Sequence, residues 1–163
     1  VFKNFLEERK AISQRLGAEN ENSLVSGEYA DGYSSTSQDV MIPAFIAAYS
    51  GKSGNDVSLK SFTKFIPMPN WRVTYDGLSK LAFINRLFKK FTVTHSYKST
   101  LNYGSFTSNL LYDVNPENED AFARDINNDF IPDLQIATVS ISEQFAPLMG
   151  FDMTLNNNML LKV

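Results

Sequence analysis

Cysteine is absent from the 163 residues of this sequence, and histidine occurs once, as His95. The absence of cysteine excludes a disulfide-stabilised scaffold and a metal site made of thiolates. His95 has no suitable carboxylate nearby in sequence, so neither a zinc site nor a Ser-His-Asp triad is indicated. A phosphate-binding glycine motif is also missing. We therefore expect no catalytic residue, no metal ligand and no cofactor, and we expect that the protein is not an enzyme.

Strong net charge and long apolar runs are lacking as well. The formal net charge of −3 offers no electrostatic argument for binding nucleic acid. No run of about 20 apolar residues is present that would form a transmembrane helix. The chain is nevertheless long enough for one domain with a hydrophobic core.

The first 69 residues have the pattern of helices and loops. Residues 4–16 are amphipathic, Asn4 and Glu7 resemble a capping box, and Gly17 is a plausible helix stop. We therefore predict a helix over residues 4–16, followed by a polar connector.

A second helix is predicted over residues 35–51, which are apolar on almost every side and therefore call for burial. Ser35 or Ser37 can cap this helix and Gly51 can end it. Pro43 either kinks the helix or marks its first turn. Residues 51–70, with Pro67 and Pro69, are predicted to be a loop.

The longest regular pattern is the alternation over residues 91–106, FTVTHSYKSTLNYGSF. Odd-numbered positions are mostly apolar or aromatic, and even-numbered positions are small and polar except for Lys98. Successive side chains on a strand point to opposite faces, so this pattern predicts a long strand between two different environments. At about 3.3 Å per residue it would span roughly 50 Å, which is rare for a soluble strand and typical of strands that cross an outer membrane.

The C-terminal part repeats this alternation. Residues 137–155 keep the same parity throughout, with Glu143 interrupting the apolar side, and they predict a second long strand. Asn156–Asn158 predicts a turn and Met159 begins a return strand. Residues 71–75 predict a shorter strand, and residues 78–90 predict a short amphipathic helix. A packed connector is the favoured interpretation of this helix, and a helix on a membrane surface is the alternative.

Residues 113–133 form an acidic stretch between the two long strands. Its default interpretation is a solvated loop. Asp125, Asn127 and Asp129 have the alternating spacing of a calcium loop, but the sharp-turn glycine and the downstream bidentate glutamate of such loops are missing. Whether this loop binds calcium stays open.

The two ends of the sequence predict that this chain is part of a larger structure. The chain begins within a helical pattern and ends within a strand pattern, so we expect a fragment of a longer polypeptide. A sheet that spans a membrane must close, and closure takes at least about 8 strands, whereas three or four are readable here. If the alternation indicates a membrane, the other strands lie elsewhere in that longer polypeptide.

Four stretches of the chain resemble the SprA/Sov family. These are GYSSTSQDVMIPAFIAAYSGK (residues 32–52), PMPNWRVTYDGLSKL (67–81), YKSTLNYGSFTSNL (97–110) and ISEQFAPLMGFDMTLNNNM (141–159), and NFLEERKAISQRLG (4–17) also fits. The resemblance covers nearly the whole chain and corresponds to a segment towards the C-terminal end of a very long polypeptide. Residues 18–31 and 113–133 match least well.

The resemblance implies an outer-membrane translocon of the type IX secretion system, linked to gliding motility at the cell surface. Such a protein is a very large single-chain antiparallel β-barrel. Folded substrates with a C-terminal secretion signal pass through its lumen and leave by a lateral opening. The implied partners are these secreted substrates, a PorV-like outer-membrane barrel, a periplasmic plug protein and outer-membrane lipid. Nucleic acid is not among them.

The predicted fold class is therefore mainly β with a few helices: a segment of a very large transmembrane β-barrel with short helices inside it or at its rim. Residues 1–163 would belong to one barrel domain, with residues 1–69 as a helical and loop lead-in and residues 70–163 as barrel strands. The lumen-facing side is predicted to hold Thr92, Thr94, Ser96, Thr100, Asn102, Thr138, Ser140, Ser142 and Gln144. The side facing lipid or packed protein is predicted to hold Val93, Tyr97, Leu101, Tyr103, Val139, Ile141 and Phe145.

Two other functions remain open. The chain could be a stand-alone α+β sheet domain that acts as a non-enzymatic cell-surface adhesion or binding module. It could also be a segment of an ordinary porin or of a TonB-dependent-type barrel, although a small-solute porin favours rings of charge in its lumen and only Arg72, Lys98 and Asp152 lie on the polar faces.

Overall fold

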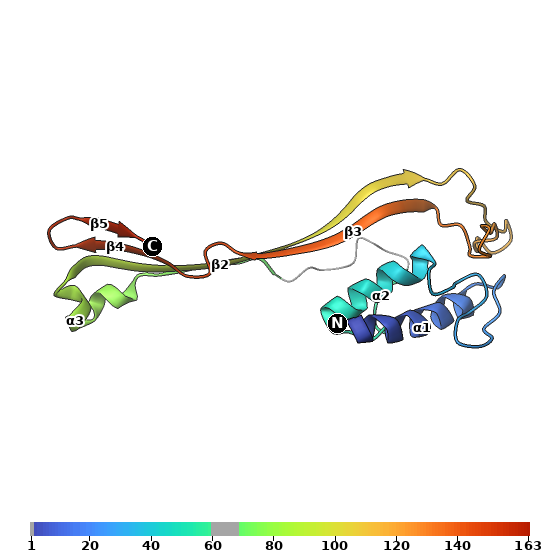
Figure 1. Cartoon of the computed structure of the whole chain (residues 1–163), viewed down its shortest axis with the longest axis horizontal. Helices are drawn as coiled ribbons and strands as arrows, with labels where there is room; N and C mark the ends of the chain where they lie inside the picture. Colours follow the sequence, from blue (N-terminus) through green and yellow to red (C-terminus); the bar gives the residue numbers. More distant parts are fainter. Residues whose placement is uncertain (1, 60–68) are drawn as a thin grey trace. The chain divides into compact units, whose positions relative to one another are not determined.

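The computed structural model describes residues 2–59 and 69–163, which form two compact units (Figure 1). We call Val1–Phe65 with Tyr103–Val139 the helical unit, and Ile66–Asn102 with Ser140–Val163 the sheet unit. Residues 60–68 of the predicted loop at residues 51–70, including Pro67, lie outside the described residues. The architecture is α+β, with a mostly antiparallel sheet and three α-helices among the described residues.

In the helical unit, α1 (Phe2–Glu19) packs against α2 (Gln38–Ser50) (Figure 1). The predicted boundaries of the first helix are wrong at both ends. Asn4 lies within α1 and not at its cap, and the helix continues through Gly17 to Glu19. Gly17 is required for packing instead, because a Cβ atom there would lie 2.3 Å from the Cβ of Ala30.

The prediction for α2 is largely confirmed. Gly51 ends the helix in the left-handed conformation, with φ of 66°, and its N–H donates to the carbonyl of Ala47. Ser37 occupies the N-cap position, although its side chain makes no capping hydrogen bond. Pro43 lies inside the helix and not in its first turn.

The core of the helical unit includes a residue from the acidic stretch. Phe130 is only 2% exposed and packs on Tyr33 with ring centroids 5.1 Å apart. Its N–H donates to the carbonyl of Gly32 at 2.8 Å. The main core residues are Ile12, Leu16, Ala30, Tyr33, Val40, Ala44, Ala47, Val57 and Phe130.

The prediction of a solvated loop over residues 113–133 is therefore wrong for residues 129–131, which are buried. The Asp129 carboxylate accepts hydrogen bonds from the N–H and the hydroxyl of Ser34, at 2.6 and 2.7 Å. Arg124 forms an ion pair with Asp31 at 2.8 Å. These contacts and the burial of Phe130 hold the segment against the helices, which its acidic composition alone did not indicate.

The sheet contains β1 (Trp71–Tyr75), β2 (Phe88–Ser108), β3 (Leu134–Phe145), β4 (Gly150–Leu155) and β5 (Leu160–Lys162). Its order is β1-β2-β4-β5, and β3 also pairs with β2. The predicted strands over residues 71–75 and 91–106 are confirmed, and β2 extends beyond the latter at both ends. The turn at Asn156–Asn158 and the return strand are confirmed as well, and Asn158 has φ of 66°.

Two predicted elements of this region are wrong. Residues 78–90 are not one helix, because they form a 3₁₀ turn η1 (Gly77–Lys80), the short α3 (Ala82–Asn85) and then the start of β2. Phe88 pairs with Leu155 of β4, so residues 88–90 belong to the sheet and not to a helix. Residues 137–155 are not one strand, since β3 ends at Phe145 and β4 begins only at Gly150; Pro147, between them, has no N–H to donate to a strand partner.

Candidate functional site

The sheet unit has one apolar face that is rich in aromatic residues. Trp71 stacks on Tyr97 with ring centroids 4.4 Å apart, and Phe145 lies 5.2 Å from Tyr97. The ring centroid of Phe91 lies 6.1 Å from that of Phe151 of β4. The outer part of this face is open, because the side chains of Val73 and Tyr75 on β1 are each 55% exposed.

The strand register carries the predicted alternation across the sheet. On β2, Val93 and His95 lie opposite Tyr75 and Val73 of β1, whereas Thr94 lies opposite Thr74. Thr92 lies opposite Asp152 of β4 on its other side. Residues directly opposite each other share a face, so the polar residues gather on one side of the sheet and the apolar residues on the other.

The polar face is more basic than the sequence alone indicated. Arg72 and Lys98 were expected there, and the register adds Lys90, opposite Thr154, and Lys162, opposite Asp152. Lys162 lies 3.9 Å from the Asp152 carboxylate. The two extra lysines were missed because their side of the sheet depends on the β2–β4–β5 pairing, which short-range alternation does not specify.

The predicted face residues differ in exposure. On the polar side Thr92 and Thr94 are buried, Ser96 and Thr100 are partly buried, and Asn102, Thr138, Ser140, Ser142 and Gln144 are exposed. On the apolar side Tyr97 is buried, Phe145 is exposed, and Val93, Leu101, Tyr103, Val139 and Ile141 are partly buried. Thr92 and Thr94 are short side chains on a strand with neighbours on both sides, which accounts for their low exposure.

His95 and Glu143 are among the polar residues on the apolar side. The His95 imidazole Nδ1 is hydrogen-bonded to the carbonyl oxygen of Leu148, and its ring lies between those of Trp71 and Phe145. The Glu143 carboxylate accepts a hydrogen bond from the Tyr97 hydroxyl. This bond explains how a glutamate is accommodated among aromatic residues.

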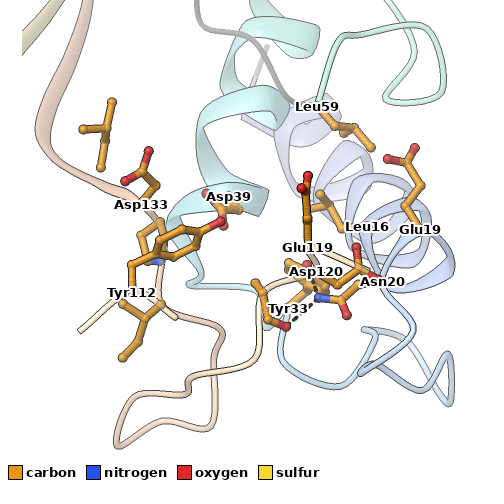
Figure 2. Close-up of a pocket in the computed structure, with 14 residues that line it drawn as sticks. Leu16, Glu19, Asn20, Tyr33, Asp39, Leu59, Tyr112, Glu119, Asp120 and Asp133 are labelled. Atoms are coloured by element: carbon orange, nitrogen blue, oxygen red, sulfur yellow. Dashed lines mark hydrogen bonds between the residues drawn. The ribbon is translucent and has the colours of Figure 1, made fainter. Parts of the chain in front are cut away.

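A second candidate site is a cavity of about 420 Å³ in the helical unit (Figure 2). Its walls come from α1, α2 and the acidic stretch, and we call it the acidic pocket. Leu16, Leu59 and Ile131 contribute apolar surface, and Tyr33 and Tyr112 contribute rings. Among the described residues, its lining contains no lysine or arginine and includes the carboxylates of Glu19, Asp39, Glu119, Asp120 and Asp133.

The pocket environment disfavours negative charge. Burial, together with the nearby Asp129 carboxylate, raises the pKa of Asp39 to about 6. Burial also raises the pKa of Tyr33 to about 12. The hydrogen bond that the Tyr33 hydroxyl accepts from Asn20, at 3.0 Å, acts in the opposite direction and lowers this pKa. The pKa of Tyr112 is raised by burial and by the charges of Asp133, Asp39 and Glu119.

The structure also shows what the calcium-like spacing does. The Asp125 carboxylate accepts hydrogen bonds from the N–H groups of Asn127 and Asp129, at 2.8 and 2.9 Å. Asp129 in turn is engaged by Ser34. Within residues 2–59 and 69–163, no group of three or more acidic or histidine side chains is placed to hold a metal ion.

A prediction follows for Asp39. Its folded-state pKa lies above the ordinary value of 3.8, so the native state binds more protons and its stability falls as pH rises from about 4 to 6. Asp39→Asn should therefore stabilise the protein at pH 7.5 by about 1–2 kcal/mol, a figure reduced for the residual exposure of the group, and have little effect at pH 4. Urea unfolding followed by the helical circular dichroism signal would measure this.

Asp31→Asn is the matched control. Its ion pair with Arg124 lowers the pKa of Asp31, so that replacement should destabilise the protein at pH 7.5 and do so less as pH falls towards the lowered pKa. An Asp39→Asn effect of equal size at both pH values would contradict the prediction.

No protein-family model matches the chain, and no curated protein matches it either. Among the described residues, no helix combines the length and apolar character needed to cross a membrane.

Proposed function

We propose that this chain forms part of the wall of a protein-conducting channel in the outer membrane, a translocon of the type IX secretion class that exports folded proteins. The observation that carries the proposal is the two-faced sheet, with an open apolar face on one side and a polar face on the other. The resemblance to the SprA/Sov family supports the same function.

The apolar face supports contact with lipid or with packed protein. Val73, Tyr75 and Leu161 are exposed on this side. Exposed apolar surface of this kind is unfavourable in water, at roughly 25 cal/mol for each Å² left uncovered. Patches of this kind typically mark contact with a membrane or another protein. In the proposed barrel, lipid or the PorV-like partner covers this face.

The polar face suits a hydrated lumen. Hydroxyl and amide side chains such as Thr74, Ser96 and Asn102 bind water without offering apolar surface to a passing protein. A conduit for folded cargo needs this property, because tight binding along the wall would stop export. In the same proposal, the periplasmic plug protein closes the channel in its alternative state.

Closure of the sheet requires other strands. The five described strands would leave open edges, and unpaired backbone groups are not tolerated in hydrocarbon. We therefore propose that the remaining strands of the barrel come from other parts of a longer polypeptide, and that the short helices lie inside the barrel or at its rim.

Cysteine labelling of adjacent β1 residues tests the assignment of the two faces. Val73 and Thr74 are both exposed within this chain but lie on opposite faces, so a difference in labelling reports on their surroundings. In isolated outer membranes, a membrane-impermeant maleimide should label Thr74→Cys at least about tenfold faster than Val73→Cys, because the thiolate forms poorly away from water. After denaturation in detergent the two variants should label equally. Faster labelling of Val73→Cys would reverse the assignment of the faces.

The same preparation tests the competing function of a cell-surface adhesion module. The open face with Trp71 and Tyr75 would also suit a non-enzymatic binding module. That function predicts equal labelling of Val73→Cys and Thr74→Cys and recovery of the protein in a soluble fraction. Either result would exclude the channel wall.

A further inference from the structure

The acidic pocket carries negative charge without an internal counter-ion. With the residues that the structure describes, the carboxylates of Glu19, Asp39, Glu119 and Asp133 make no hydrogen bond and no ion pair. Asp120 is the exception, since it accepts a hydrogen bond from the N–H of Glu21 at 2.8 Å. Arg124, the arginine of the acidic stretch, forms an ion pair with Asp31 instead.

Asp39 is the most informative of these groups. It is largely buried in the first turn of α2, it lines the pocket, and it has no partner among the described residues. In Figure 2 its carboxylate lies on the same side of the pocket as Tyr112 and Asp133. A buried carboxylate without a partner is costly, and an incoming cation would remove that cost.

The shape and lining of the pocket favour an organic cation over a metal ion. In the described part of the chain, no three acidic side chains converge closely enough to hold a metal. The carboxylates are instead spread around a cavity of about 420 Å³ that also has apolar walls at Leu16, Leu59 and Ile131. This volume is within the range of small-ligand sites, about 300–1,000 Å³. The rings of Tyr33 and Tyr112 add surfaces that attract cations.

We propose that the acidic pocket binds a protonated amine or guanidinium group carried on an apolar stem, as in a lysine or arginine side chain. The apolar walls cover the stem and the carboxylates of Asp39 and Asp133 bind the charged end. The pocket lies entirely within the helical unit, so this site does not depend on the function of the sheet.

Isothermal titration of the intact protein at pH 7.5 tests the proposal with three probes. Acetyl-Gly-Lys-Gly-amide carries the cation on a peptide, n-pentylamine carries it as a free amine, and acetyl-Gly-norleucine-Gly-amide is the neutral peptide of matched shape. The lysine peptide or the amine should bind at least about tenfold more tightly than the norleucine peptide, as expected for a charge-assisted hydrogen bond. The ranking of the two cationic probes then identifies whether the source is a peptide or a free amine.

Variants place the binding in the pocket. Asp39→Asn and Asp133→Asn should each weaken binding of the cationic probe about tenfold. Glu117→Gln removes an exposed carboxylate of the same acidic stretch that does not line the pocket, and it should change the affinity less than about twofold. Equal affinity for the norleucine peptide, unchanged affinity in both aspartate variants, or an equal loss in Glu117→Gln would overturn the proposal. If Asp39→Asn misfolds, as judged by circular dichroism, Asp133→Asn at an exposed position decides the question.

Discussion

Phe130→Ala is expected to destabilise the helical unit by about 3–5 kcal/mol, the usual cost of removing a buried aromatic side chain. Phe130 is almost fully buried, packs on Tyr33 and lies under the Arg124 guanidinium, 4.3 Å from the ring centroid. No local rearrangement of the acidic stretch would fill the space that the ring leaves between Tyr33 and Gly32, because the same stretch is tied to Ser34 through Asp129.

Hydrogen exchange of the α1 and α2 amides measures this effect in the intact protein. A loss of 3–5 kcal/mol corresponds to exchange that is about two to four orders of magnitude faster for amides that open with the unit. Phe122→Ala is the matched control, since Phe122 is on the same stretch but 60% exposed, and it should change exchange little. Equal effects of the two variants would show that the acidic stretch does not contribute to the core.

Gly32→Ala is the second large effect, expected to cost about 2–4 kcal/mol. Gly32 has φ of 80°, a conformation that costs a residue with a Cβ atom roughly 1–2 kcal/mol. A Cβ atom at this position would also lie 2.3 Å from the Phe130 ring, so the ring must move from its place in the core.

Gly27→Ala separates the two causes. Gly27 has nearly the same φ, 82°, but a Cβ atom there would have nothing within 4 Å. It should therefore show the backbone cost alone, about 1–2 kcal/mol. In the background of Phe130→Ala, the cost of Gly32→Ala should fall to that of Gly27→Ala, because the two residues in contact are coupled. Urea unfolding of the four variants measures these differences, and additive costs for Gly32→Ala and Phe130→Ala would show that the ring is not the obstacle.

These two variants also bear on the acidic pocket. Phe130 and Gly32 anchor the stretch that supplies Glu119, Asp120 and Asp133, whereas Asp39 comes from α2. Loosening the anchor should therefore weaken binding of a cationic probe even though neither residue lines the pocket. A stable protein that keeps its affinity after Phe130→Ala would mean that the carboxylates are held in place by other contacts.

The sequence by itself determined the strands and the two faces of the sheet. Period-two alternation is a property of neighbouring residues, so residues 91–106 and 71–75 were predicted to be strands, with alternate residues on opposite faces. Gly51 and Asn156–Asn158 were predictable for the same reason, since the left-handed backbone is decided locally. The apolar residues of α2 likewise predicted correctly that this helix is largely buried.

Only the tertiary structure decided the acidic pocket and the path of the acidic stretch. Asp39 and Asp133 are far apart in sequence, and Phe130 was one apolar residue among many carboxylates. Their positions follow from pairing and packing across about 90 residues, for which local pattern carries no signal. For the same reason, Lys90 lies in β2 and not in a helix, because it pairs with Thr154 of β4. Gly17 likewise allows close packing against Ala30 and does not end α1. In each case a long-range contact outweighed a local preference.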